Sequence, residues 1–409
     1  MVQLPRRRRF RTGRSDERPR GGGTSVRVIH DADEARAVVA EAHRSGHQLL
    51  TSSEVLGFPD LPGVLHARVE PTSGLRFDEQ RNVFRVPAGL SIDGFVRAVE
   101  DVGCSVPYPR WHKGTALQYF LDAGVGPAAR RLGVATGAVR SVLVVTADGH
   151  LIRTSPEKEP DLFWALRGGG GGFGIVLEAE IALAPAPRTV LVTQEWKEVD
   201  PGPVMEAWVQ NAAMEVDSAS PSLSISAVTS DGLARVTAET FVHEDQQDNP
   251  RLAQAVVARA VQQLARLRPD DVRVTTTTPV EVRATSRNRR FGAAVVGASE
   301  LTALTATNAL IGGAVSAFHV ERLGGKAASS TGWSAAVDHF DAPFLLRAAP
   351  SDAKVVHAIA EPFHLGWGRS ATGQDPVDVS TIRGFFDRHG IFTPDLDADR
   401  GPGFIGPVG

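Results

Sequence analysis

Residues 139–184 read VRSVLVVTADGHLIRTSPEKEPDLFWALRGGGGGFGIVLEAEIALA, and this stretch decides the fold. Residues 142–146 form a continuous apolar run, which is typical of a strand buried on both faces. The Ala-Asp-Gly sequence at 147–149 predicts a tight hairpin turn into a second strand at 151–152. The glycines at 168–172 let the backbone approach another group closely, with N–H groups available to anionic oxygens.

The pattern of strands and helices differs between the two sides of this stretch. The N-terminal side alternates strands and amphipathic helices, whereas the part after Pro185 has longer, β-branched strands separated by two helices. Before 139 we expect strands at 26–29, 48–50 and 83–86 and helices at 31–46 and 92–102. After 185 we expect strands at 190–193, 223–228, 235–241 and 272–278, helices at 204–214 and 252–267, and further strands between 318 and 349.

Composition limits the function classes. The chain has 409 residues, 42% of them hydrophobic and 22% charged, which predicts a globular protein of two or more lobes. The net charge of -3 argues against a nucleic-acid partner. No apolar stretch reaches the roughly 18 residues of a membrane span, so no membrane partner is expected. The single cysteine, Cys104, excludes an internal disulfide and a multi-cysteine metal site, and no metal is predicted.

The first 23 residues differ from the rest of the chain. They carry eight arginines and end in three glycines. An Arg-Arg pair is also found in export signals, but neither an apolar core nor a small-residue cleavage site follows it here. We therefore expect a disordered basic extension and a cytoplasmic protein.

Three segments within 139–184 carry a resemblance to a known family: SVLVVTADG at 141–149, DLFWALR at 161–167 and GGGGGFGIV at 168–176. Together they resemble the FAD-binding domain of the vanillyl-alcohol-oxidase fold, in particular the berberine-bridge-enzyme-like oxidoreductases. The resemblance covers residues 25 to about 350 and implies an α+β fold of two lobes. We expect a tail at 1–23, a PCMH-type FAD-binding domain at 24–187, a substrate domain with an antiparallel sheet at 188–365, and a C-terminal tail at 366–409.

The sequence departs from this family at the positions that bind FAD in its members. Members use a second glycine-rich loop, often with a histidine bonded to the flavin, where this chain has Thr51-Ser52-Ser53-Glu54-Val55. Glu54 would place a carboxylate near phosphate oxygens, at a cost of several kcal/mol if desolvated. The second covalent anchor, a cysteine in some members, is Trp111, and Asp122 interrupts a glycine stretch. These losses predict that no cofactor is bound.

A pocket without flavin predicts a non-redox cyclase, of the pericyclase type, acting on a large apolar polyketide-like natural product, for example in a (4+2) cycloaddition. Orienting a flexible substrate can remove up to about 7–11 kcal/mol of its barrier. Two alternatives remain open. The first is an FAD-linked oxidase of the same family with noncovalent FAD, and the second is an inactive binding protein.

The candidate residues follow from this hypothesis. Catalytic candidates are Tyr119, His112, Lys113, Glu54 and Asp122. Substrate-binding candidates are Trp111, Phe120, Leu117, His319, Glu321 and His339. If FAD is retained, the resemblance implies that it is held by Gly168, Gly169, Gly170, Gly171, Gly174 and Ile175. Tyr119 is equally compatible with a core aromatic, and the alternation of His319 with Glu321 equally with a solvent-facing strand.

Overall fold

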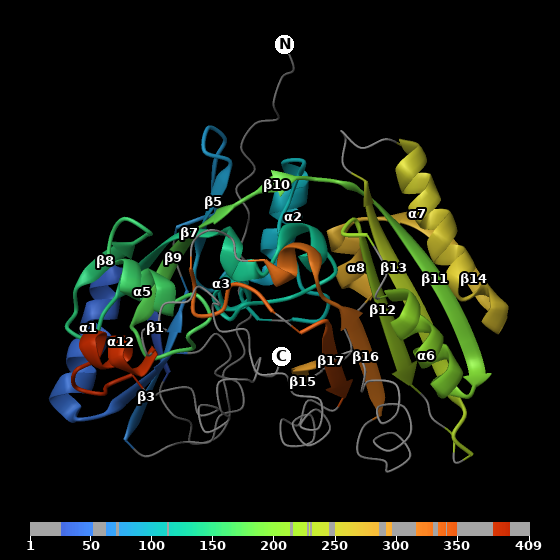
Figure 1. The fold of residues 1–409 in the computed structure, drawn as a ribbon. Coiled ribbons are helices and arrows are strands. Elements are labelled where there is room, and N and C mark those ends of the chain that lie inside the picture. Colours follow the sequence, from blue (N-terminus) through green and yellow to red (C-terminus); the bar gives the residue numbers. More distant parts are fainter. Residues whose placement is uncertain are drawn as a thin grey trace.

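Figure 1 shows the computed structural model of the chain, in which two lobes lie side by side. The structure describes residues 26–51, 63–70, 73–112, 114–212, 216–226, 229, 231–244, 250–285, 292–296, 316–329, 334–340, 342–349 and 379–392. Every structural statement below concerns these residues. Glu54 and Lys113 lie outside them.

The first lobe contains a five-stranded antiparallel sheet in the order β4-β5-β9-β7-β8. Its strands are β4 (Arg76–Asp78), β5 (Val83–Pro87), β7 (Val139–Val145), β8 (Leu151–Thr154) and β9 (Ile175–Ala182). The apolar run predicted as a buried strand is the second half of β7. The predicted hairpin joins β7 to β8, and Gly149 adopts a left-handed φ of 76° in its turn.

Helices α2 (Ile92–Asp101), α3 (Ala116–Leu121) and α5 (Pro160–Ala165) pack with this sheet into one core. Helix α2 buries Ile92, Phe95, Val96 and Val99, because these positions fall on one helical face. The Phe95 ring lies edge to face against Phe120 of α3, with ring centroids 5.6 Å apart. Shorter elements complete the lobe: β6 (Cys104–Ser105), β10 (Ala184–Pro185), α4 (Ala129–Leu132) and the 3-10 turn η1 (Ala135–Ala138).

A second, three-stranded parallel sheet has the order β1-β3-β2 and packs against α1. Its elements are β1 (Val26–Ile29), β2 (Gln48–Thr51), β3 (Val64–Val69) and α1 (Ala32–Ser45). The Asp31 side chain caps α1 by accepting two backbone N–H bonds, and Gly46 ends it in a left-handed conformation with φ 66°. Both ends of this helix were predicted from sequence.

The second lobe is a seven-stranded antiparallel sheet in the order β14-β11-β13-β12-β16-β17-β15. Its strands are β11 (Arg188–Val199), β12 (Ala219–Ser226), β13 (Ala234–Glu244), β14 (Asp271–Thr277), β15 (Gly292–Val296), β16 (Ala317–Arg322) and β17 (Phe344–Ala349). Helices α6 (Pro201–Ala212) and α7 (Pro250–Gln263) cover one face, as Figure 1 shows. The rest are η2 (Ala265–Leu267), α8 (Pro279–Thr285) and η3 (Gly325–Ala328).

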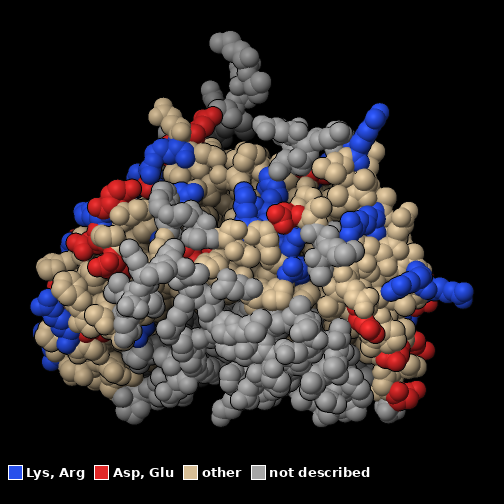
Figure 2. Space-filling model, viewed as in Figure 1, with Lys and Arg blue, Asp and Glu red and all other residues tan. Residues whose placement is uncertain are grey.

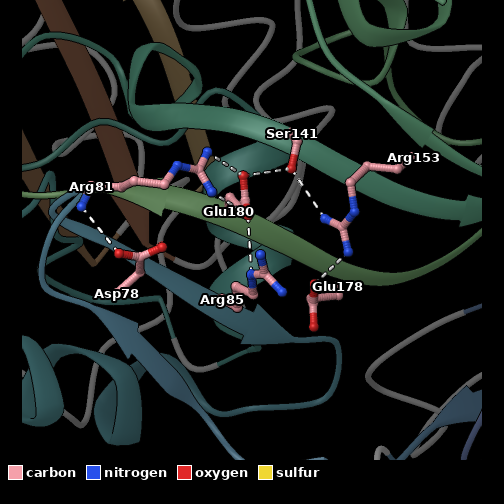
Figure 3. A network of polar contacts seen from close by, with 7 residues as sticks. All are labelled: Asp78, Arg81, Arg85, Ser141, Arg153, Glu178 and Glu180. Carbon is pink, nitrogen blue, oxygen red and sulfur yellow. Dashed lines mark hydrogen bonds and ion pairs between the residues drawn. The ribbon is translucent and has the colours of Figure 1, made fainter. Parts of the chain in front are cut away.

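One face of the five-stranded sheet carries a network of charged side chains (Figure 3). Glu180 of β9 is buried and accepts hydrogen bonds from Arg81, Arg85 and Ser141. The hydrogen bond from Arg81 is the main reason that the pKa of Glu180 lies below its ordinary value. The network ties β5, β7 and β9 together across the sheet.

The C-terminal helix α12 (Val379–Phe386) packs on α5 of the first lobe (Figure 1). It was not predicted, because the sequence around it is rich in glycine and polar residues. The residues that follow return to the three-stranded sheet, where Phe392 forms a parallel bridge with Leu49 of β2. The segment at 379–392 therefore contacts both sheets of the first lobe.

Within the described residues, no helix is both long enough and apolar enough to cross a membrane. On the face drawn in Figure 2, basic side chains gather near the middle of the molecule, with an acidic side chain among them.

Candidate functional site

The inner face of the seven-stranded sheet, opposite α6 and α7, carries polar side chains toward the first lobe. On β16, Phe318 and Val320 pack into the core with the helices, so His319 and Glu321 point the other way. Strand pairing places Ser224 of β12 and Arg347 of β17 on either side of His319. The sequence predicted that His319 and Glu321 share one face, and the structure places that face against the first lobe.

Two polar pairs organise this inner face. The Arg347 guanidinium forms an ion pair with Glu321 and donates a second hydrogen bond to the Val125 carbonyl, at 2.9 Å. The Ser224 hydroxyl and His319 Nδ1 are 2.9 Å apart and form the other pair. Because Glu321 and Arg347 are both buried, each depends on the other to offset the cost of losing water. The pair therefore holds the Glu321 carboxylate in one orientation.

Trp111 lies between the lobes and closes this inner face. Its ring meets the His319 ring edge to face, with centroids 4.4 Å apart. The guanidinium carbons of Arg110 and Arg347 lie 5.0 and 5.5 Å from the same ring, within the range of cation–π attraction. The Arg110 guanidinium is itself paired with Glu239 of β13. Contacts on several sides therefore fix the orientation of the Trp111 ring.

Tyr119 of α3 provides a buried hydroxyl beside this wall. The side chain packs so closely on Gly124 that a Cβ added there would lie 2.1 Å from the ring. Within the described part of the chain, its hydroxyl makes no hydrogen bond. Burial raises the pKa of the Tyr119 phenol above its ordinary range, so the hydroxyl stays protonated and can donate. A buried hydroxyl without a protein partner is suited to a ligand atom.

His112 is buried near Tyr119, with ring centroids 5.8 Å apart. Burial lowers the pKa of His112 to about 4, so the ring is neutral at physiological pH. Its Nε2 lies 3.2 Å from the Thr115 carbonyl, which can only accept, and this assigns the ring proton to Nε2. Arg283 of α8 donates to the His112 carbonyl and so fixes the backbone here.

The glycine run at 168–174 has a backbone suited to an anion. Gly168, Gly170, Gly172 and Gly174 have positive φ values of 95°, 76°, 96° and 146°, while the residues between them do not. Alternating backbone handedness of this kind turns successive N–H groups toward one side, as in anion-binding nests. Gly170 and Gly171 are exposed, and a Cβ added at either meets no atom within 4 Å. The run therefore fits the diphosphate of a dinucleotide.

The flanking glycines serve packing instead. A Cβ on Gly168 would come within 2.7 Å of Val337, and one on Gly174 within 2.4 Å of the Val145 carbonyl. The Gly168 N–H donates to the Leu121 carbonyl at 2.7 Å, which places the end of α3 at the start of the run. Asp122, the next residue, is exposed there. Ile175 is buried as the first residue of β9.

The other predicted residues have different surroundings. Leu117 and Phe120 lie in the main core of the first lobe. His339 is buried, and its Nδ1 is hydrogen-bonded to the neighbouring Asp338. The structure thus brings Trp111, His112, Tyr119, His319 and Glu321 together at the lobe boundary. Their roles stay predictions.

Sequence reasoning missed Arg347, Arg110 and Arg383. Arg347 pairs with a residue 26 positions away, and Arg110 with one 129 positions away, so no local pattern reveals either pair. Arg383 of α12 donates to two carbonyls of the glycine run. For Arg110 one signal existed, since it directly precedes the predicted Trp111 in a short segment rich in cationic and aromatic residues.

Comparison with known proteins agrees with this architecture. No family model matches the chain. One relative, the FAD-linked oxidoreductase tazL of Aspergillus terreus, is 36% identical over 111 residues, covering 27% of this chain and 22% of that protein. Another, the (R)-6-hydroxynicotine oxidase of Paenarthrobacter nicotinovorans, is 41% identical over 71 residues, covering 17% and 16%. The chain therefore matches less than a third of the length of each relative.

Solved structures match over nearly the whole chain. A 6-hydroxy-D-nicotine oxidase from Arthrobacter nicotinovorans has a TM-score of 0.68 at 17% identity, with 90% of each chain covered. The carbohydrate oxidase of Microdochium nivale has a TM-score of 0.69 at 14% identity, with 91% of each chain covered. Berberine bridge enzyme itself matches with a TM-score of 0.67.

One expectation from the sequence is wrong. The losses around Glu54, Trp111 and Asp122 predicted a chain without a cofactor, yet the relatives include proteins named FAD-linked oxidoreductases, and the solved structures with this fold include oxidases. The side chains at these positions are poor indicators of cofactor loss, because an anion can be bound by the backbone of a glycine run alone.

Proposed function

We propose that this chain is an FAD-linked oxidoreductase that holds FAD noncovalently and acts on a small, mostly apolar organic molecule. Two findings support the proposal: the chain shares the fold of berberine bridge enzyme, and its glycine run has the alternating backbone of an anion-binding nest. The observation that carries the proposal is the alternation of positive φ through Gly168, Gly170, Gly172 and Gly174.

The residues present fit FAD at the glycine run. FAD would supply two-electron oxidation of an organic substrate. The exposed N–H groups around Gly170 and Gly171 would hold the diphosphate. The attachment is noncovalent, because the family's covalent anchors correspond to Val55 and Trp111 here, and neither side chain can bond to a flavin.

The substrate would lie alongside Trp111 and Tyr119, where the inner face of the seven-stranded sheet meets the first lobe. Trp111 supplies an apolar wall, since cation–π and edge-to-face contacts fix its ring. Tyr119 donates a hydrogen bond to a polar atom of the substrate. Glu321, oriented by Arg347, takes up the proton that a substrate O–H or N–H releases on oxidation. His112 stays neutral and adds no charge to the site.

The test is the flavin content of the purified protein. After incubation with FAD and gel filtration, we expect a flavin absorbance spectrum with close to one FAD per chain. Precipitation with acid should then release all the flavin into the supernatant, because no covalent bond holds it. A colourless protein after incubation with FAD would overturn the proposal, and flavin retained in the pellet would overturn its noncovalent part.

Cyclisation of an extended apolar substrate is a second candidate function. The buried aromatic side chains of Trp111 and Tyr119 favour it, because a rigid wall can fix a flexible chain in a reactive conformation. The mass of the product distinguishes oxidation from cyclisation. An oxidation removes two hydrogen atoms from the substrate, whereas a cyclisation gives an isomer of unchanged mass, and mass spectrometry separates these outcomes.

A further inference from the structure

The C-terminal segment at 379–392 lies against two elements that flank the proposed cofactor site. Helix α12 packs on α5, the helix that directly precedes the glycine run (Figure 1). Past the helix, the Ile391 carbonyl accepts a hydrogen bond from the Leu49 N–H, and Phe392 forms a bridge with the same residue. Leu49 belongs to β2, which ends at Thr51. The segment thus connects the end of β2 with the glycine run.

Arg383 of α12 makes the contact with the run itself. Its Nε donates to the Gly171 carbonyl at 3.1 Å, and its Nη2 donates to the Gly169 carbonyl at 3.3 Å. The guanidinium carbon lies 5.3 Å from the centre of the Phe173 ring. A Cβ added to Gly172 would lie 2.7 Å from Arg383 Nε. One side chain thus contacts every residue from 171 to 173.

These contacts add to the restraints at the start of the run, where the N–H groups of Gly168 and Gly169 donate to the Leu121 and Ala165 carbonyls. Consecutive glycines lose more conformational entropy on ordering than any other residues, so an unrestrained run would seldom adopt one backbone geometry. Arg383 engages the carbonyls at alternate positions, and in an alternating backbone the carbonyls and the N–H groups point to different sides. The guanidinium therefore does not engage the N–H groups of the exposed Gly170 and Gly171, which stay available to an anion.

The position of Arg383 is itself fixed from the C-terminal side. The Asp387 carboxylate accepts hydrogen bonds from the backbone N–H groups of Ile391 and Phe392, both at 2.9 Å. This closes the turn after α12 and directs the chain onto β2. His389 adds an edge-to-face contact with His43 of α1, with ring centroids 5.1 Å apart.

We infer that Arg383 is a positioning residue, which holds the glycine run in the conformation that binds the FAD diphosphate. This inference rests on the proposed function. It assigns to the C-terminal helix, whose Arg383 contacts carbonyls of the run and the Phe173 ring, a role in cofactor affinity. Arg383 acts through the backbone of the run, so it is a positioning residue and not a catalytic one.

The experiment compares Arg383→Ala and Arg383→Lys with Arg388→Ala. Arg388 is an exposed arginine in the same segment that lies over Phe385, and its variant is the matched control. Two quantities are measured: hydrogen exchange of the peptide covering 167–175 in the flavin-free protein, and the dissociation constant for FAD by flavin fluorescence. We expect faster exchange and about tenfold weaker FAD binding in Arg383→Ala, a smaller effect in Arg383→Lys, and no change in Arg388→Ala.

The outcomes separate this inference from the proposed function. Unchanged exchange in Arg383→Ala would overturn the restraint, and faster exchange with unchanged FAD affinity would overturn its role in cofactor binding. If Arg383→Lys behaves as the natural protein in both measurements, charge alone acts and the positioning role is contradicted. If the natural protein binds no FAD while Arg383→Ala still exchanges faster, the proposed function fails and the restraint on the run is supported.

Discussion

At the scale of single residues, the site depends on side chains whose polar atoms are buried between the lobes. Glu321 is tied to Arg347, His319 to Ser224, and His112 to the Thr115 carbonyl. Tyr119 differs from these, because its hydroxyl has no partner within the described residues. A buried hydroxyl without a hydrogen bond destabilises the fold slightly, which is consistent with a group kept for a ligand.

Replacing Tyr119 by Phe separates the effect of the hydroxyl on stability from its effect on the reaction. We expect the free energy of unfolding to stay within about 0.5 kcal/mol of the natural value or to rise, because no hydrogen bond to a described residue is lost. The rate of flavin reduction by the best substrate in a panel of aromatic alcohols and amines should fall about tenfold or more. Denaturant unfolding and anaerobic stopped-flow absorbance measure the two quantities.

Tyr108→Phe is the control, since it removes the hydroxyl of the only other tyrosine in the chain, which lies in the same hydrophobic core as Tyr119 but is not among the proposed site residues. An equal loss of rate in both variants, or marked destabilisation by Tyr119→Phe, would contradict the assignment of the Tyr119 hydroxyl to the substrate.

At the scale of elements, the sequence predicted most strands and helices of both lobes because their signals are local. The Asp31 cap, the Gly46 stop and the hairpin at 147–149 each act within a few residues. Several elements were not predicted, among them strands β3, β4, β9 and β15 and helices α3, α5, α8 and α12. The segment at 379–392 is stabilised by contacts with α5 and Leu49, residues more than 200 positions away, which no local pattern can indicate.

The β5-β9-β7 layer of the first lobe carries a prediction of its own. Glu180→Gln should lower the free energy of unfolding by about 1–3 kcal/mol at pH 7, because three side chains lose a charged acceptor in a buried position. Since the folded-state pKa of Glu180 is depressed, its stabilisation is present above the unfolded pKa and is lost as the pH falls through the folded value. The difference between variant and natural protein should therefore shrink in acid.

Glu178→Gln is the matched control on the same strand. Glu178 pairs with the partly exposed Arg153, so its loss should cost less than about 1 kcal/mol. Urea unfolding at pH 7 and at pH 3 measures both variants. Equal effects of the two substitutions at pH 7, or a Glu180→Gln effect that persists unchanged in acid, would show that the contacts of Glu180 in the Figure 3 network are not what stabilises this layer.

At the scale of the whole molecule, the two lobes meet where Trp111 of the first contacts His319 on the polar sheet face of the second. The resemblance in residues 139–184 was sufficient to predict this two-lobed fold, and the solved structures share it over 90% of the chain. The site was predicted in part. Trp111, His319 and Glu321 do meet, but the arginines that hold them come from strands and loops whose pairing only the folded chain defines.

The cofactor expectation failed for a related reason. Side chains such as Glu54 and Asp122 can be read from sequence, whereas the alternating backbone of Gly168–Gly174 is a property of the folded chain. Phosphate affinity at such a site comes from backbone N–H groups, so the loss of side-chain contacts weakens binding without removing the cradle.

A glycine run that binds the diphosphate of FAD must distinguish FAD from riboflavin. Both carry the same isoalloxazine ring, but riboflavin has no phosphate. Isothermal titration of each into the flavin-free protein should give a dissociation constant for FAD at least about 100-fold lower than that for riboflavin, because several charge-assisted N–H contacts are made only by FAD. Equal affinity for the two flavins, or no binding of FAD, would contradict the account.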